Sequence, residues 1–284
     1  MYKTAAYLMI MPVLLILLLL MVYPVGLSIY TSLTDRRIGT PGNFVGFDTY
    51  RRVINQPIFL RTLMNTSLYV SITLALKTIL GLMLALLLHH IPVGRNFLRA
   101  IVLLPWVVPT SMSVLIWQWM FDPSFSVLNW ILSQLGLNRV PWLGSPFWAR
   151  LAVITVNVWR GIPFFSIAFG AGLTAIPQEL YESASIDGAA GIQQFLRITF
   201  PLLKPVFNIV LLYSLVMTIA DFDIVHILTR GGPFQSTHLL GTLAYQVGLP
   251  GTQISQGAAI SLFLFPILLF AAFFALRVVI RQEM

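Results

Sequence analysis

Long apolar stretches alternate with short polar connectors along the whole chain. Six stretches are long enough to cross a bilayer core, which needs about 20 consecutive apolar residues in a helix. They lie at about residues 5–30, 63–88, 98–120, 149–172, 203–228 and 257–280. The pattern predicts an all-α polytopic membrane protein, a single transmembrane domain over residues 1–284 with six transmembrane helices. An even number of spans places both termini on the same side.

Prolines interrupt the third stretch, 98–120. Pro105 and Pro109 lack a backbone N–H, and proline inside a helix kinks or breaks it. Neighbouring helices in a membrane protein can satisfy the backbone groups that such a break frees. We therefore expect this span to be bent within the membrane.

One connector, residues 179–205, is a polar island that contains three of the nine acidic residues. We expect a helix over 178–186, a turn at Asp187 and Gly188, and a second helix over 189–199 that ends at Pro201. The second helix carries an apolar stripe with helical spacing, formed by Ile192, Phe195, Leu196 and Thr199. Such a stripe needs either a partner surface or a lipid interface.

Composition excludes an ordinary water-soluble domain. Hydrophobic residues make up 58% of the chain, charged residues only 9%, and the mean hydropathy is +0.87. The net charge of +8 comes from cations that flank apolar spans, where they meet anionic lipid head groups, so no nucleic-acid partner is implied. The chain has no cysteine, which excludes disulfides, thiolate metal sites and thiol catalysis.

The chain lacks a phosphate-binding loop. That motif contains Gly-Lys-Ser/Thr, and none of the three lysines, Lys3, Lys77 and Lys204, follows a glycine. We therefore expect no ATP hydrolysis by that route and no cofactor held by this chain.

Ionisable groups inside the predicted spans are costly, so we expect them to be paired or to face a cavity. Two polar faces with helical spacing, 157–164 on the fourth span and 214–221 on the fifth, indicate a midplane site for a hydroxyl-rich ligand. Aromatic rings nearby offer a surface for the apolar face of a sugar. The predicted substrate-binding residues are Trp106, Asn157, Arg160, Gly161, Phe164, Ser214, Met217, Thr218 and Asp221.

The roles of the charged residues stay open at this point. Arg160 either selects an anionic or phosphorylated sugar derivative or neutralises Asp221 in a structural ion pair. Lys77 is interpreted as a packing residue that acts by pairing, and Asp223 as a hydrated residue near the outer face.

Histidines and tryptophans at the span ends have plainer interpretations. His89 and His90 are expected at a solvated helix end, since no partner for a metal site lies at helical spacing. His226 and His238 are expected to be interfacial. An outer aromatic belt is predicted from Trp117, Trp119, Trp142 and Trp148.

Two motifs carry a resemblance to a known family. The first spans Glu182, Ser183, Ala184, Gly188, Ile198, Phe200 and Pro201. It resembles the EAA loop of binding-protein-dependent ABC importer permeases, from which it departs only at Ser183 and Phe200. The second, residues 228–237, resembles the LT-x-GGP-x-x-ST signature of maltose-type carbohydrate permeases of the first-permease type. With the six spans, the resemblance covers about residues 5–282.

The resemblance implies an inner-membrane permease subunit of a carbohydrate ABC importer, not an enzyme. Its implied partners are a second permease subunit, two copies of a cytoplasmic ATPase that bind ATP and magnesium, and an extracytoplasmic sugar-binding protein. The island would be a cytoplasmic helix-turn-helix coupling loop over 177–202. The residues implied to couple it to the ATPase are Glu182, Ala184, Asp187, Gly188, Ile192, Phe195, Ile198 and Pro201.

The location implied is the bacterial or archaeal cytoplasmic membrane, with both termini cytoplasmic. This orientation comes from the resemblance, because seven cations on one side and eight on the other do not decide it by charge. A different class of protein, a proton-coupled secondary transporter using Asp221 and Asp223, remains as the alternative.

Overall fold

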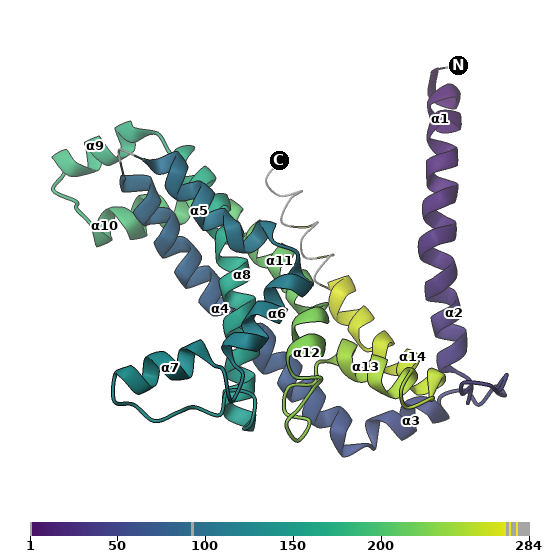
Figure 1. Cartoon of the computed structure of the whole chain (residues 1–284). Helices are drawn as coiled ribbons and strands as arrows, with labels where there is room; N and C mark the ends of the chain where they lie inside the picture. The colour runs from purple at the N-terminus through teal and green to yellow at the C-terminus, as the bar shows by residue number, and fades with distance from the viewer. Residues whose placement is uncertain (1, 92–93, 271–272, 274–276, 278–284) are drawn as a thin grey trace. The chain divides into compact units, whose positions relative to one another are not determined.

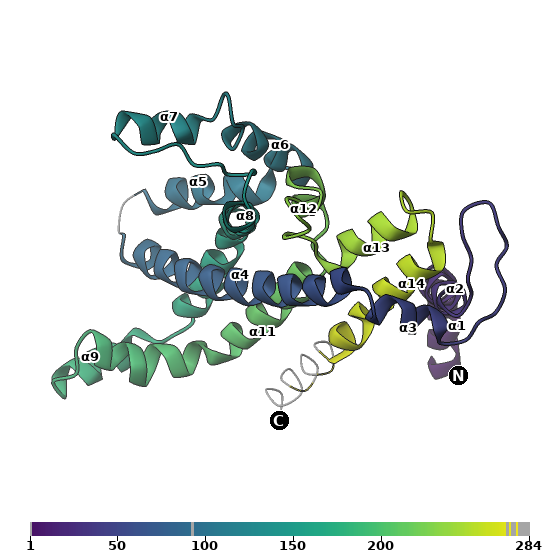
Figure 2. The ribbon, with the colours of Figure 1, turned by 90° about the horizontal axis from the view of Figure 1, so that it is seen from below.

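The computed structural model describes residues 2–91, 94–270, 273 and 277. Throughout these residues the regular structure is helical, and the only extended pairing is a single antiparallel bridge between Thr34 and Phe44. The predicted all-α class is confirmed. Figures 1 and 2 show the helices in two views related by a quarter turn.

Contacts divide the chain into two compact units. Unit 1 comprises residues 2–60 and 240–266, and unit 2 comprises residues 61–239 with the described residues after 266. The N-terminal helices of unit 1 are α1 (Tyr2–Leu17), a π-helical turn (Leu18–Val22) and α2 (Tyr23–Ser32).

The rest of unit 1 is a small helical cluster made of α3 (Asp48–Ile54), α13 (Leu240–Gly248) and α14 (Ile254–Leu262). Helix α14 packs on α2, α3 and α13. The approach to α13 is closest at two glycines, because a Cβ on Gly257 would lie 2.6 Å from the Cα of Gly248.

Unit 2 contains the long helices, together with the shorter segments that link them. Its elements are α4 (Pro57–His90, whose first turn belongs to unit 1), α5 (Arg95–Val107), α6 (Thr110–Met120), α7 (Val127–Gln134), α8 (Pro146–Thr174), α9 (Gln178–Ile186), α10 (Ile192–Gln194), a π-helical turn (Phe195–Thr199), α11 (Phe200–Ile219) and α12 (Asp223–Leu228).

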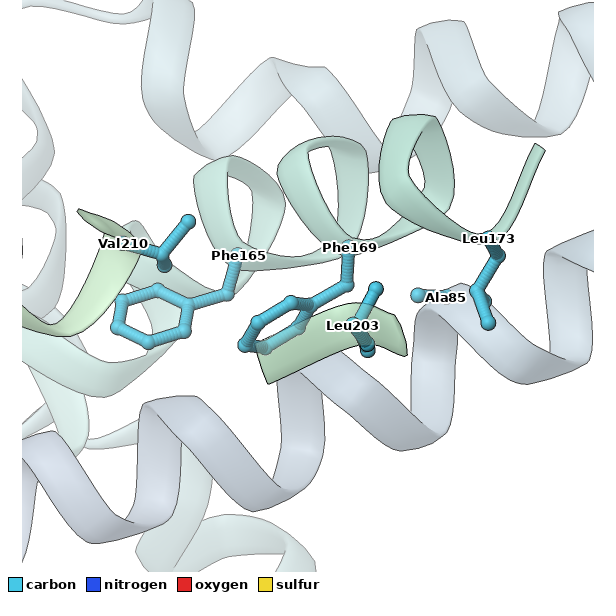
Figure 3. Packing of buried hydrophobic residues seen from close by; sticks show 6 residues of the cluster. All are labelled: Ala85, Phe165, Phe169, Leu173, Leu203 and Val210. Atoms are coloured by element: carbon cyan, nitrogen blue, oxygen red, sulfur yellow. The ribbon is translucent and has the colours of Figure 1, made fainter. Parts of the chain in front are cut away.

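The core of unit 2 lies between α4, α8 and α11. Figure 3 shows Phe165 and Phe169 of α8 beside side chains from the other two helices, and their ring centroids are 5.8 Å apart. The buried cluster consists of Ala85, Phe165, Phe169, Leu173, Leu203 and Val210.

Helices α4 and α8 cross at two glycines that receive side chains from the opposite helix. A Cβ on Gly81 would collide with Phe165, and a Cβ on Gly161 would collide with the side chain of Lys77. The two contacts are offset by four residues on both helices, so the helices run parallel at this crossing. Glycine at these two positions therefore sets how closely the helices approach.

Four helices in the described part of the chain are long and apolar enough to cross a membrane. They are Met9–Ser32, Pro57–His90, Pro146–Thr174 and Ile192–Leu228. The bent pair of Asn96–Val107 and Thr110–Met120 gives a fifth crossing if it is counted as one span, and a shorter apolar helix covers Ile254–Phe270. Several apolar membrane helices are thus present. Of the predicted sixth span, 257–280, most of the part after residue 270 lies outside the described residues.

The predicted bend in the third span is confirmed. Helices α5 and α6 meet at an angle of 90°. Val108 between them has extended backbone angles, with φ −67° and ψ 134°. A residue before proline is disfavoured in the helical region, so Pro109 accounts for the position of the break.

The prediction that a helix ends at Pro201 is wrong. The chain stays helical from Ile192 to Ile219, and Pro201 lies in the first turn of α11. The turn before it, Phe195–Thr199, is π-helical. A π turn shifts the hydrogen-bond pairing by one residue, and we attribute the unbroken course of the helix to this adjustment next to a residue without an N–H.

Candidate functional site

A cavity of about 440 Å³ lies within unit 2, between α4, α5, α6, α8, α11 and α12. All nine predicted substrate-binding residues line it, the eight from the two polar faces and the aromatic Trp106: Trp106, Asn157, Arg160, Gly161, Phe164, Ser214, Met217, Thr218 and Asp221. Their convergence is a finding of the structure, while their contact with a substrate stays a prediction. Lys77 and Asp223 also line the cavity.

The end of α11 positions the acidic group of the cavity. Ser214 and Thr218 lie on α11, which ends at Ile219, and Asp221 lies in the link before α12 begins at Asp223. Because the link is not helical, the Asp221 carboxylate reaches α4 and α8 instead of following the face of α11.

Asp221 is held by two side chains from different helices. The hydroxyl of Tyr69 on α4 donates a hydrogen bond to its Oδ2, and the Nδ2 of Asn157 on α8 donates another over 2.8 Å. Sequence reasoning missed Tyr69. The signal was present, since Tyr69, Thr73 and Lys77 repeat at four-residue spacing along one face of α4.

Lys77 is 4% exposed, and its ammonium group is paired within the protein. Its Nζ donates to the Oγ1 of Thr218 over 2.7 Å, and that hydroxyl donates to the carbonyl oxygen of Ser214 over 2.6 Å. The Lys77 charge also interacts with the Asp221 carboxylate. This geometry joins α4 to α11, in agreement with the interpretation of Lys77 as a residue that stabilises helix packing.

Arg160 has no such partner. Its Nε is buried and makes no hydrogen bond, and no ion pair to Arg160 occurs among the residues that the structure describes. The groups around Asp221 are Tyr69, Asn157, Lys77 and the backbone of Ile224. The interpretation that Arg160 neutralises Asp221 therefore finds no contact in the structure.

Aromatic rings form one side of the cavity. Trp106 and Phe164 are stacked, with centroids 6.4 Å apart and an interplanar angle of 29°. Phe164 also contacts Tyr213, with centroids 4.8 Å apart. These rings provide a flat apolar surface opposite the polar groups, which suits the apolar face of a sugar ring.

The coupling segment is folded around Gln194. Its Nε2 donates to the Oγ of Ser185 and to the carbonyl oxygen of Ala189, each over 2.9 Å. Gly188 has φ +80°, a left-handed conformation that glycine adopts at little cost. The helix α9 has the predicted bounds, and both overview figures place α9 and α10 at one extremity of unit 2.

Apolar side chains of the coupling segment remain uncovered in the isolated chain. Ile186 is 87% exposed and Ile192 is 76% exposed. The stripe predicted on this segment does not form one face: Ile192 and Leu196 are exposed, whereas Phe195 is half-buried and Thr199 is buried. The π-helical turn explains the difference, because it rotates later residues away from the 3.6-residue spacing.

The remaining predicted coupling residues lie on or near this surface. Glu182, Asp187, Gly188 and Pro201 are exposed, and Ala184 and Ile198 are half-buried. The segment is also tied to the base of α11, since the hydroxyls of Tyr181 and Thr199 are 2.9 Å apart and hydrogen-bonded.

The Gly-Gly-Pro loop is fixed to α4 and α8. Arg61 donates a hydrogen bond to the carbonyl oxygen of Phe234, and Asn65 donates one to the carbonyl oxygen of Gln235, both at 3.1 Å. The Nε of Arg150 donates to the carbonyl oxygen of Ser236 at 2.9 Å. His238 is 2% exposed, and its position at the membrane interface stays a prediction. Its ring fills the space beside a residue without a side chain, Gly231.

The other histidines and tryptophans lie at helix ends and in one aromatic cluster. His89 and His90 end α4, and no cluster of metal-ligating side chains is found in the described part of the chain. The ring of Trp142 packs against those of Phe121 and Trp148 at 5.4 Å each. Trp119 is 79% exposed.

Comparisons with known proteins were made by sequence profile, sequence and structure. The profile of the "Binding-protein-dependent transport system inner membrane component" family matches residues 77–283. The chain is similar to the trehalose/maltose transport system permease protein MalF of Thermococcus litoralis, at 40% identity over 93% of this chain and 89% of that protein. It is 34% identical to the sulfoquinovosyl glycerol transport system permease protein SmoG of Agrobacterium fabrum, over 99% of this chain and 92% of that protein.

Among solved structures, the chain is similar to one from a bacterial ABC transporter involved in the import of the acidic polysaccharide alginate. The TM-score is 0.83 at 27% identity, over 97% of this chain and 96% of that chain.

Proposed function

Because the chain belongs to the family of binding-protein-dependent transport system inner membrane components, we propose that its membrane cavity passes a sugar or sugar derivative into the cytoplasm. The chain is a permease subunit of an ATP-binding-cassette importer and not an enzyme, and ATP hydrolysis belongs to a separate subunit. The alternative of a proton-coupled secondary transporter is not supported, since the relatives are importer permeases.

The sugar is proposed on one observation above all. Every residue predicted to contact a hydroxyl-rich ligand lines one cavity, which combines hydrogen-bonding groups with the stacked rings of Trp106 and Phe164. Ligand pockets commonly join an apolar wall to a few well-placed polar groups. One relative is named for trehalose and maltose transport and the other for sulfoquinovosyl glycerol transport, and both names agree with this class of cargo.

A single long helix supports the proposed coupling. Ile192 in the coupling segment and Ser214 in the cavity belong to one continuous helical stretch, from Ile192 to Ile219. They are separated by about 33 Å of helix at 1.5 Å per residue. We propose that ATP binding closes the ATPase dimer, moves α9 and α10, and thereby shifts the part of this helix that lines the cavity.

The proposed topology completes this scheme. It has six spans, both termini in the cytoplasm and the coupling loop over 177–202 facing the ATPase, with Glu182 as a docking residue. A second permease subunit would complete the pathway, and an extracytoplasmic binding protein would deliver the sugar. Apolar coupling residues such as Ile192, 76% exposed in the isolated chain, would then be covered by the ATPase.

Co-purification tests the proposed function. The tagged chain is isolated from native membranes as wild type, Glu182→Ala and Glu179→Ala, and the ATPase activity of the accompanying proteins is measured. Glu179 is the matched control because it is also an exposed acid on α9. We expect a second permease and an active ATPase with the wild type and the control, and loss of the ATPase from Glu182→Ala. A chain that purifies alone and still moves solute into vesicles contradicts the proposal.

A further inference from the structure

We propose that Arg160 binds an anionic group of the transported sugar, such as a carboxylate, sulfonate or phosphate. The inference rests on the proposed function of the cavity, and it narrows the cargo from sugars in general to acidic sugars or sugar derivatives. It is argued from the charges in the cavity and from the groups that remain without partners.

Four ionisable groups line the cavity, and they are not equivalent. Lys77 is paired with Thr218 and lies near Asp221. The Asp221 carboxylate accepts hydrogen bonds from Tyr69 and Asn157. Asp223 is exposed at the start of α12. Of the two cations, Arg160 is thus the one left without an anion or an acceptor in the described part of the chain.

The position of an unpartnered Arg160 in a membrane helix needs a physical explanation. An arginine at the centre of a membrane helix is costly, and such residues usually face a partner or a water-filled pathway. A guanidinium presents five N–H donors in a planar fork that matches carboxylate and phosphate oxygens. The missing partner of Arg160 is therefore expected to be an oxyanion.

A second unpartnered atom lies three residues away on the same helix. The Oδ1 of Asn157 is buried and has no hydrogen-bond donor, although the Nδ2 of the same side chain is bonded to Asp221. A free acceptor is complementary to a sugar hydroxyl, whereas the free Nε–H of Arg160 is complementary to an anion. With Trp106 and Phe164 as a stacking surface, the cavity offers separate places for a hydroxyl, an acidic group and a ring face.

The competing explanation is that an acidic residue of another subunit neutralises Arg160. In that case Arg160 stabilises the assembly, and its replacement weakens transport of every cargo equally. An anionic cargo instead makes the loss depend on the charge of the sugar. The two explanations are separated by the ratio of acidic to neutral sugar uptake, which a structural role does not change.

The test uses the complete importer, with its binding protein, reconstituted in vesicles. Uptake of two matched disaccharides is measured, cellobiose and the same disaccharide with a glucuronate in place of one glucose. The variants are Arg160→Gln, Arg160→Lys and Arg150→Gln. Arg150 lies on the same helix, outside the cavity, where it is bonded to Ser236 and Asn65, so it controls for the loss of an arginine from α8.

We expect the wild type to prefer the acidic disaccharide. Arg160→Gln should lower uptake of the acidic disaccharide by about ten- to a hundredfold, the range for one hydrogen bond to a charged group, and should lower uptake of the neutral disaccharide by a much smaller factor. Arg160→Lys should restore part of the preference, and Arg150→Gln should leave the ratio unaltered. A wild type that prefers the neutral disaccharide, or an equal loss for both in Arg160→Gln, overturns the inference but leaves sugar transport intact. Absence of ATP-driven uptake of every sugar tried, these two and trehalose and maltose included, contradicts the proposed function itself.

Discussion

The cavity of unit 2 places polar groups among apolar helices, whereas the coupling segment places apolar side chains on a polar connector. In the cavity, polar and charged groups lie in helices that are otherwise apolar, and most of them are paired within the chain. In the coupling segment, Ile186 and Ile192 protrude from a polar connector, and no part of the chain that the structure describes covers them. The first region is largely completed by intramolecular bonds, whereas the second is the surface that we propose the ATPase covers.

Because of this difference, we expect substitutions in the cavity to change the stability of the chain and substitutions in the coupling segment to change its association with a partner. Groups bonded within the chain contribute to its own stability, because a buried polar group that loses its partner costs free energy. Exposed apolar groups contribute little to the stability of the isolated chain and more to association, since their burial occurs only when the partner binds. Substitutions in the two regions should therefore separate stability from coupling.

The largest effect is expected for Asp221→Ala. The substitution leaves Tyr69, Asn157 and the Lys77 ammonium without the anion that they surround. Removing one partner from a buried charged group costs about 3 kcal/mol or more in the free energy of unfolding. Thermal denaturation of the detergent-solubilised protein, followed by tryptophan fluorescence, measures the loss.

Asp223→Ala is the matched control for that variant. Asp223 lines the same cavity but is exposed, and we expect a change within about 0.5 kcal/mol, as for other surface substitutions. Equal destabilisation by the two variants would remove the distinction between a bonded and a hydrated carboxylate.

An intermediate effect, on coupling and not on folding, is expected for Gly188→Val. The glycine has φ +80°, and a side chain in the left-handed region costs about 1–2 kcal/mol. Because the turn sets how α9 meets α10, we expect ATP-driven uptake in vesicles to fall by about tenfold, the rate equivalent of that energy. Membrane insertion should be normal.

The comparison variant for this turn is Gly136→Val. Gly136 has φ +73° in an exposed position after α7, so it imposes the same strain elsewhere in unit 2. Uptake should be close to wild type in that variant. Normal uptake in Gly188→Val would show that the turn takes no part in coupling.

The smallest effect is expected for Ile192→Ser. Ile192 is 76% exposed, so its side chain contributes little to the stability of the isolated chain, and the melting temperature should not fall. If the ATPase covers it, affinity should drop by about fivefold, which corresponds to about 1 kcal/mol of partly buried apolar surface. Leu135→Ser, at a residue 69% exposed after α7, should change neither quantity. Unaltered binding in Ile192→Ser would mean that the ATPase docks elsewhere.

Sequence reasoning succeeded where one local rule determined the outcome. Apolar length predicted the membrane helices, the prolines of 98–120 predicted the bend before Pro109, and the turn at Gly188 was placed between two helices. Eight cavity residues were identified because two helical faces with polar residues at 3.6-residue spacing converge, and Trp106 was added as a ring for stacking.

It failed where neighbouring segments decide the outcome. Tyr69 donates to Asp221 from a helix more than 150 residues earlier; the spacing of Tyr69, Thr73 and Lys77 marks a polar face on α4 but does not identify Asp221 as the partner. The apolar stripe after Ile192 was misjudged because a π-helical turn changes the spacing, and the packing of His238 beside Gly231 is a tertiary feature that the sequence did not predict.

The paired glycines at the crossing of α4 and α8 restrict how the protein can change shape. Sliding one helix along the other by a single residue would bring a Cβ to the place of Gly81 or Gly161, where no room exists for one. These contacts therefore oppose sliding of α4 along α8. We therefore expect the two helices to rock together through the transport cycle, with changes of angle confined to the breaks at Val108 and at residues 220–222.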